Sequence, residues 1–105
     1  MTLKIDGFVL ELAGEMRGVL REIGRHDRDL ERQARAALTS IVLNGREGAR
    51  QLRGSRRARF DTAMGSADEV TGVLLVAAAL GYIDGQPRLV DGFDRVARTY
   101  FKLRR

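Results

Sequence analysis

Residues 38–52 read LTSIVLNGREGARQL, and two glycines stand in the middle of an otherwise amphipathic helical pattern. Apolar residues such as Leu38 and Ile41 recur three and four positions apart, and on a helical wheel Gly45 and Gly48 fall within their stripe. A glycine inside a helix costs roughly 1 kcal/mol relative to alanine. A core-facing glycine offsets this cost by letting a neighbouring helix approach closely. We therefore predict that both glycines face the core of a helical bundle.

The same spacing extends along almost the whole chain. β-Branched residues never alternate with polar ones over the length of a strand, and apolar runs of helical period begin at Phe8, Leu30, Phe60 and Leu89. Short connections between successive helices favour antiparallel neighbours. The pattern predicts one all-α domain over residues 1–105, folded as an up-down-up-down antiparallel four-helix bundle.

Turn-forming and capping residues predict where the helices begin and end. Asp6, Asp27 and Ser55 are the expected N-caps of the first three helices, and Gly24 is a possible C-cap of the first. Residues 82–87, YIDGQP, have the composition of a turn. The second and third helices would then be about 38 Å long.

Composition restricts the class of protein. Charged residues make up 31% and hydrophobic residues 44% of the 105 residues, as in a soluble globular domain. The chain contains no cysteine, which suits a reducing cytoplasm. Residues 1–12 lack the long apolar run of a signal peptide. The most apolar stretch, residues 70–83, is shorter than the roughly 20 residues of a membrane span. We expect a cytoplasmic protein without membrane association.

The net charge of +5 is unevenly distributed along the chain. Basic and acidic residues balance in residues 1–43, whereas residues 44–60 hold six arginines and one glutamate. Residues 61–87 carry only acidic charges, and residues 88–105 are basic again. Segregated charge of this kind indicates a polyanionic partner. The alternative is a solvated surface in an arginine-rich protein, since the chain has seventeen arginines and two lysines.

Two basic stripes are the strongest functional candidates. One crosses the turn between the second and third helices, and the other lies on the last helix opposite Phe93 and Tyr100. Such stripes suit contact with a phosphate backbone, which positions a protein without reading sequence. The candidate nucleic-acid-binding residues are Arg46, Arg50, Arg53, Arg56, Arg57, Arg59, Arg95, Arg98, Lys102 and Arg105.

A second set of polar residues lies along the second and third helices. We predict that it forms a hydrogen-bonded network, either between these helices or at a subunit contact, because buried polar groups need partners. The alternative is a ligand or catalytic cluster built on a carboxylate pair, Glu47 and Glu69. The residues of the set are Ser40, Asn44, Glu47, Ser66 and Glu69.

The third helix is apolar nearly all round between Val70 and Leu80. A helix of this kind is buried on several sides. Met64, Leu75 and Val76 are therefore candidates for a subunit interface. The alternative is a wide core with a few exposed aliphatic side chains.

Catalytic and metal chemistry have little support in the sequence. His26 is the only histidine, lies in a charged turn, and has no cysteine or paired carboxylate at helical ligand spacing. There is no Gly-x-Ser-x-Gly motif, no cysteine nucleophile and no glycine-rich loop after a strand. We predict no catalytic residue, no metal ligand and no cofactor.

The stretches RQARAALTSIVLNGREG, AMGSADE and LLVAAALGY together resemble a bacterial family. It comprises the four-helix-bundle proteins encoded in intervening sequences of large-subunit ribosomal RNA genes, and its superfamily includes the accessory variability proteins of diversity-generating retroelements. The resemblance covers residues 30–83, and Gly45-Arg46 replaces the usual Ile-Ala. The matching positions are Ala36, Ser40, Ile41, Asn44, Glu47, Gly48, Ala63, Gly65, Ser66, Glu69, Leu80, Gly81 and Tyr82.

The resemblance implies a non-catalytic bundle that assembles as a homo-oligomeric ring, typically a pentamer. Its retroelement branch implies binding of nucleic acid and of a reverse transcriptase through a basic surface. We therefore expect an oligomeric, basic bundle that binds structured RNA, DNA or an RNA–protein complex such as a reverse transcriptase. The alternative is a structural or adaptor homo-oligomer with a protein partner and no nucleic acid.

Overall fold

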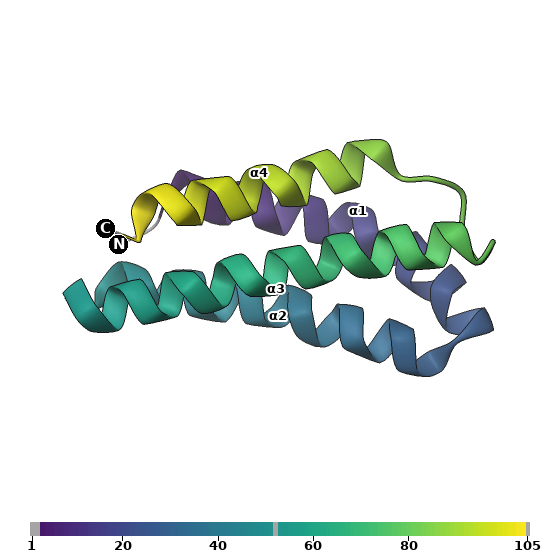
Figure 1. Cartoon of the computed structure of the whole chain (residues 1–105), viewed down its shortest axis with the longest axis horizontal. Coiled ribbons are helices and arrows are strands. Elements are labelled where there is room, and N and C mark those ends of the chain that lie inside the picture. The colour runs from purple at the N-terminus through teal and green to yellow at the C-terminus, as the bar shows by residue number, and fades with distance from the viewer. Residues whose placement is uncertain (1–2, 52, 105) are drawn as a thin grey trace.

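The computed structural model describes residues 3–51 and 53–104, with every side chain among them except that of Arg53. The predicted contact residue Arg105 lies outside the described residues. Within them the chain forms four helices, which are α1 (Lys4–His26), α2 (Arg28–Arg50), α3 (Arg53–Ala79) and α4 (Pro87–Leu103). Successive helices run in opposite directions side by side, and α4 returns to pack on α1 (Figure 1). The predicted antiparallel four-helix bundle is confirmed.

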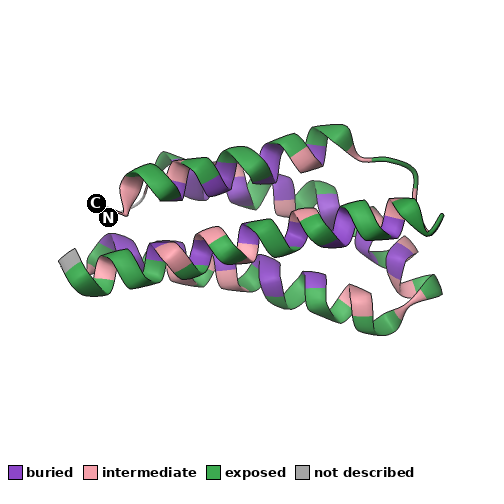
Figure 2. Ribbon diagram, viewed as in Figure 1, coloured by how far each residue is buried: buried purple, intermediate pink, exposed green. Residues whose placement is uncertain are grey.

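The core follows the predicted apolar stripes. Buried residues face the inside of the bundle on all four helices, and exposed residues cover the outside (Figure 2). Phe60, Phe93 and Tyr100 are among the largest fully buried side chains, and the rings of Phe60 and Tyr100 lie 5.4 Å apart between centroids. None of the described helices is long and apolar enough to cross a membrane.

The two glycines of the second helix make room for two of these aromatic rings. Gly45 and Gly48 are both buried on α2. A Cβ atom at Gly45 would lie 2.9 Å from Cζ of Tyr100, and one at Gly48 would lie 2.6 Å from Cε1 of Phe60. The prediction that both glycines face the core is confirmed, and what approaches them closely is an aromatic side chain.

Asp27 both ends α1 and begins α2. Its backbone is extended, its N–H donates to the carbonyl of Ile23 at 2.8 Å, and its carboxylate accepts from the N–H of Leu30 at 2.9 Å. The predicted N-cap is therefore confirmed. The predicted C-cap at Gly24 is wrong, because α1 continues to Asp27. Gly24 instead faces α2, where an added Cβ would lie 2.6 Å from Cδ of Glu31.

Two other predicted caps lie inside their helices. Asp6 belongs to the first turn of α1, and its carboxylate accepts a hydrogen bond from the N–H of Leu3 at 3.1 Å. Ser55 lies within α3, which begins at Arg53. The α2–α3 connection lies earlier than predicted: α2 ends at Arg50, where the N–H of Gln51 donates to the carbonyl of Gly48, and α3 begins at Arg53.

A left-handed glycine ends α3 and directs the chain toward α4. Gly81 has φ of +78°, and the N–H of Tyr82 donates to the carbonyl of Ala77 at 2.9 Å. This turn stacks the Tyr82 ring on His26 of α1, with centroids 4.9 Å apart. The predicted turn is confirmed, and Pro87 occupies the first position of α4, where its missing N–H costs nothing.

Candidate nucleic-acid interface

The bundle topology brings the two basic segments of the chain to the same end. The end of α2, the start of α3 and the end of α4 all lie there (Figure 1). Arg104 of α4 pairs with Asp61 of α3 at 3.0 Å, and Arg59 of α3 donates to the side-chain oxygen of Asn44 of α2 at 3.2 Å. Phe60 and Gly45 both pack against Tyr100 of α4, so segment 44–60 meets the C-terminal part of segment 88–105 at one end of a molecule that is 43 Å long.

Four of the predicted contact residues at this end are exposed and form neither a salt bridge nor a side-chain hydrogen bond with any described residue, whereas the exposed Arg59 is bonded to Asn44. They come from three different helices, and we refer to them as the basic end. The basic end consists of Arg46, Arg50, Arg57 and Lys102.

The remaining predicted arginines already have intramolecular contacts. Arg98 pairs with Asp94 one turn earlier in α4. Arg95 lies over the ring of Phe8 at 4.6 Å, so it covers the contact between α4 and α1. Two residues of the predicted stripe on α4 are therefore already engaged, Arg98 within its own helix and Arg95 in the packing of α4 on α1.

Arg56 differs from the other arginines of the first stripe because it is half-buried. Its guanidinium lies 5.4 Å from the centre of the Phe60 ring, and its Nε atom is buried without a hydrogen-bond partner among the described residues. The contacts of Arg56 are those of a packing residue. The side chain of Arg53 lies outside the described residues.

The predicted polar set is only partly brought together. Ser66 of α3 donates to the hydroxyl of Ser40 of α2 at 2.7 Å, and the Asn44 amide donates to the Ser40 carbonyl at 3.0 Å. With the bond from Arg59 to Asn44, these residues cross-link α2 and α3.

The two glutamates of that set lie apart from the cross-link. Glu47 accepts a hydrogen bond from Gln51 of its own helix at 2.7 Å, and Glu69 is exposed, with no hydrogen bond to a described side chain. Along the antiparallel helices, Glu47 lies beyond Asn44 toward the basic end, and Glu69 lies beyond Ser66 toward the other end. The structure therefore does not bring the proposed carboxylate pair together.

The candidate interface residues of α3 differ in exposure. Met64 is half-buried and packs against the core. Leu75 and Val76 are 56% and 48% exposed, and Leu80, which was not predicted, is 59% exposed. These three apolar side chains, two near the end of α3 and one directly after it, form an exposed surface that we call the ridge of α3.

Three arginines that the sequence interpretation did not select are also exposed and form no salt bridge with a described residue. Arg17 and Arg21 lie on α1, and Arg28 begins α2. They belong to residues 1–43, whose charges balance in number. A helical-wheel comparison of Glu15 with Arg17 and Arg21 would have shown that acids and bases occupy different sides of α1.

The pKa shifts of Glu15 and Tyr100 follow from contacts and burial within the bundle. A bidentate pair with Arg88 lowers the pKa of Glu15 and joins α4 to α1 through distances of 2.9 and 3.1 Å. Burial, together with the nearby Asp6 carboxylate, raises the pKa of Tyr100 to about 12. Among the described residues, no three His, Asp or Glu side chains gather closely enough to hold a metal ion.

Comparison of the chain with protein-family models, with curated proteins and with solved structures found no match. The resemblance of residues 30–83 to the ribosomal intervening-sequence proteins therefore stays a prediction.

Proposed function

We propose that this protein is a non-enzymatic cytoplasmic bundle that binds the phosphate backbone of structured RNA or other nucleic acid through its basic end. The observation that carries this proposal is the position of Arg46, Arg50, Arg57 and Lys102 at one end of the bundle, on three helices and without a carboxylate partner among the described residues. Unpaired cations gain most from phosphate, because no existing salt bridge has to be broken when they bind it. Binding also releases counterions from the nucleic acid, which supplies sequence-independent affinity.

The chemistry of the basic end fits backbone recognition better than base recognition. Three of the four cations are arginines, whose planar guanidinium matches two phosphate oxygens at once. Contacts of this type set the position and orientation of the nucleic acid without reading its sequence. A ribonucleoprotein such as a reverse-transcriptase complex offers the same backbone, so it belongs to the same partner class.

The proposal is tested by fluorescence-anisotropy titration of a labelled RNA hairpin across a series of salt concentrations. The logarithm of the binding constant should fall linearly with the logarithm of the salt concentration. Each phosphate contact should add about 0.7–0.9 to the magnitude of the slope. Arg50→Gln and Arg57→Gln should each weaken binding and reduce the slope by about one contact. No binding at low salt would show that the proposal is wrong.

Arg98→Gln provides a matched control for these substitutions. It removes the same charge from an exposed arginine, but one that Asp94 already neutralises. We expect the salt slope of this variant to equal that of the wild type. An equal loss in all three variants would mean that binding follows net charge alone and needs no basic end.

A second copy of the chain is the partner that we propose for the exposed ridge of α3. Leu75, Val76 and Leu80 expose about half or more of their side chains, which favours burial against another protein surface. Residues 61–87, which contain the ridge, carry four acidic and no basic residues, whereas much of the remaining surface is rich in arginine. We propose a homo-oligomer, and the family resemblance favours a pentameric ring. If nucleic acid does not bind, this ridge would carry an adaptor function.

A further inference from the structure

The charges of α1 are sorted onto two sides of the helix. Glu11, Glu15 and Glu22 follow one another at helical spacing, and Glu15 pairs with Arg88 of α4. Arg17 and Arg21 form a second stripe that continues to Gly24, which faces Glu31 of α2. The acids of α1 therefore lie on its α4 side, and these arginines lie on its α2 side.

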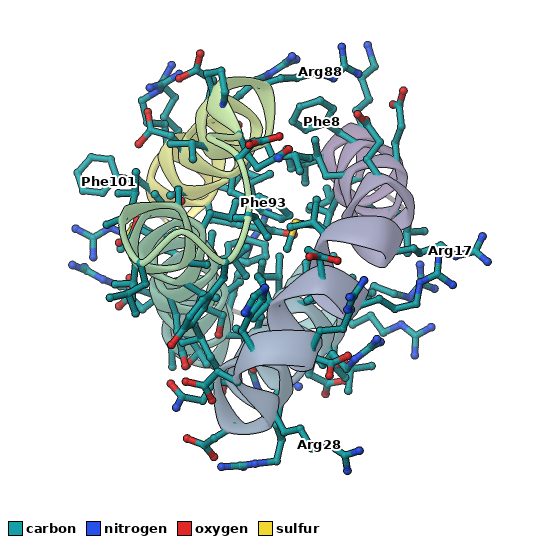
Figure 3. All side chains as sticks on the ribbon, turned by 90° about the vertical axis from the view of Figure 1, so that its right-hand side faces the viewer. Phe8, Arg17, Arg28, Arg88, Phe93 and Phe101 are labelled. Carbon is teal, nitrogen blue, oxygen red and sulfur yellow. The ribbon has the colours of Figure 1, made fainter. Side chains whose placement is uncertain are left out.

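The arginines of α2 continue this second stripe. We call the combined surface the α1–α2 arginine face, and all its members are exposed and lack a salt bridge to any described residue. Figure 3 shows Arg17 extending away from the bundle on the side opposite Phe101. The face consists of Arg17, Arg21, Arg28, Arg46 and Arg50.

Two acids of α2 near the start of this face are already neutralised, whereas Glu47, next to Arg46, accepts a hydrogen bond from Gln51 and pairs with no described cation. Glu31 pairs with Arg35 at 2.8 Å, and Asp29 pairs with Arg32 within the same helix. An anion that approaches the Arg28 end of the arginine face therefore meets little competing negative charge.

One end of the face is shaped as a hollow. Arg21, Gly24 and Arg25 of α1, together with Arg28 and Glu31 of α2, line an open depression of about 610 Å³ at the α1–α2 turn. Two of its arginines, Arg21 and Arg28, come from different helices and have no carboxylate partner among the described residues. Two guanidinium groups beside a side-chain-free glycine suit a phosphate group.

The distance between the two ends of the face is close to the length of one helical turn of duplex DNA. Arg28 and Arg50 are the first and last residues of the 23-residue helix α2, so they lie roughly 33 Å apart along its axis. The 3.6-residue period brings both to within about 40° on the same side of the helix. One turn of duplex DNA spans about 34–36 Å. A duplex that lies along α2 would thus present equivalent backbone segments to both ends.

The aromatic residues favour a duplex over a single strand. Proteins that bind single strands stack bases on exposed aromatic rings. Here Phe60, Phe93 and Tyr100 are fully buried. Phe8 lies under Arg95, and Tyr82 stacks on His26. Phe101 is 54% exposed, but Arg104 lies over its ring, and it is on the side of the bundle opposite Arg17 of the arginine face (Figure 3).

From these observations we infer that the α1–α2 arginine face binds a nucleic-acid duplex lengthwise. One backbone contact is made by Arg21 and Arg28 at the hollow, and the other by Arg46 and Arg50 at the basic end. The inference rests on the proposed function and adds the orientation, the minimum length and the double-stranded form of the ligand.

Duplex length provides the first test. Labelled DNA and RNA duplexes of 6, 12 and 18 base pairs are titrated at low salt, with single strands of the same lengths alongside. A 6-base-pair DNA duplex is about 20 Å long and cannot reach both contacts, whereas a 12-base-pair duplex can. We expect at least a tenfold gain in affinity from 6 to 12 base pairs and only a small statistical gain at 18. A smooth increase with length, or equally tight binding of single strands, would overturn the inference.

The double variant Arg21→Gln/Arg28→Gln provides the second test. Both side chains are exposed and unpaired among the described residues, so the bundle should remain folded, as circular dichroism would verify. Affinity for the 12-base-pair duplex should fall at least tenfold, to that of the 6-base-pair duplex. The control is Arg95→Gln/Arg98→Gln, which removes two charges from α4 and should leave the length dependence unchanged.

The outcomes separate this inference from the proposed function. If Arg50→Gln weakens binding and Arg21→Gln/Arg28→Gln does not, the lengthwise duplex is wrong and the basic end remains. If none of the duplexes or hairpins binds with a salt-dependent constant, both are wrong. If the α4 control loses as much affinity as the α1–α2 variant, the arginine face is not the site.

Discussion

Single residues explain why this chain keeps glycines inside its helices. Alanine is a better helix former than glycine by about 1 kcal/mol, yet at Gly45 a methyl group would collide with Tyr100. Overpacking of a core usually costs about 1–3 kcal/mol, so the steric cost exceeds the gain in helix propensity. We expect Gly45→Ala to lower the free energy of unfolding, measured by urea denaturation.

Gly14 provides the control for this prediction. It is exposed on α1, and an added Cβ would have no neighbour within 4 Å. Gly14→Ala should therefore raise the free energy of unfolding by about 0.5–1 kcal/mol. Similar stabilisation by both substitutions would show that Tyr100 does not fill the space beside Gly45.

Tyr100 gives the bundle a predictable sensitivity to alkali. Burial and the Asp6 carboxylate raise the pKa of Tyr100 to about 12 in the folded state, whereas an unfolded tyrosine titrates near 10. Between these values the unfolded state loses a proton that the folded state keeps, so the fold loses stability as pH rises from about 10 to 12. The free energy of unfolding should fall by about 1.4 kcal/mol for each pH unit in this range.

The alkaline effect is measured by urea denaturation at pH 9, 10 and 11. Tyr100→Phe should remove the steep loss above pH 10, because phenylalanine does not ionise. If the variant keeps the same pH dependence as the wild type, another group is responsible for it.

At the scale of the element, the end of α3 depends on Gly81. Its positive φ lies in a region that costs an alanine about 1–2 kcal/mol. Gly81→Ala should therefore lower the free energy of unfolding by about that amount and disturb the stacking of Tyr82 on His26. Gly85→Ala in the same connection is the control, because an added Cβ there meets nothing within 4 Å. Equal effects of both substitutions on thermal unfolding would contradict the role of Gly81.

The helices and their buried faces could be predicted because the apolar period is a local property of the sequence. Their ends could be predicted only where one residue determines the turn, as Asp27 does. Asp6 and Ser55 have good capping side chains, but the chain enters these helices two or three residues earlier. Residue type alone does not predict the first residue of a helix where the path of the backbone determines it.

The candidate interface was harder to predict, because it depends on which charges remain unpaired. The pairing of Arg98 with Asp94 spans four residues and could have been read from the sequence. The pairing of Arg88 with Glu15 spans 73 residues and needed the fold. Counting charge by segment also concealed Arg17 and Arg21, since the acids that balance them lie on another side of the same helix.

At the scale of the whole molecule, the apolar ridge and the arginine face lie on different helices, although Leu43 of α2 is also exposed. The ridge of α3 is apolar and lies in a segment without basic residues, whereas the arginine face lies on α1 and α2. Because the unpaired arginines do not lie on the ridge, a polyanion bound to them would leave the ridge accessible to a different partner. A surface divided in this way allows one chain to associate with its own copies and still hold a polyanion.

This division predicts that self-association depends on the ridge. Leu75→Glu places a charge at the centre of the exposed apolar surface, so burial of that surface would leave the carboxylate without water. We expect the wild type to form a concentration-dependent oligomer in light scattering coupled to size-exclusion chromatography, and Leu75→Glu to elute as a monomer. Leu10→Glu is the matched control, because Leu10 of α1 is 57% exposed, against 56% for Leu75. A monomeric wild type would exclude the homo-oligomer, and an unchanged Leu75→Glu oligomer would move the interface away from α3.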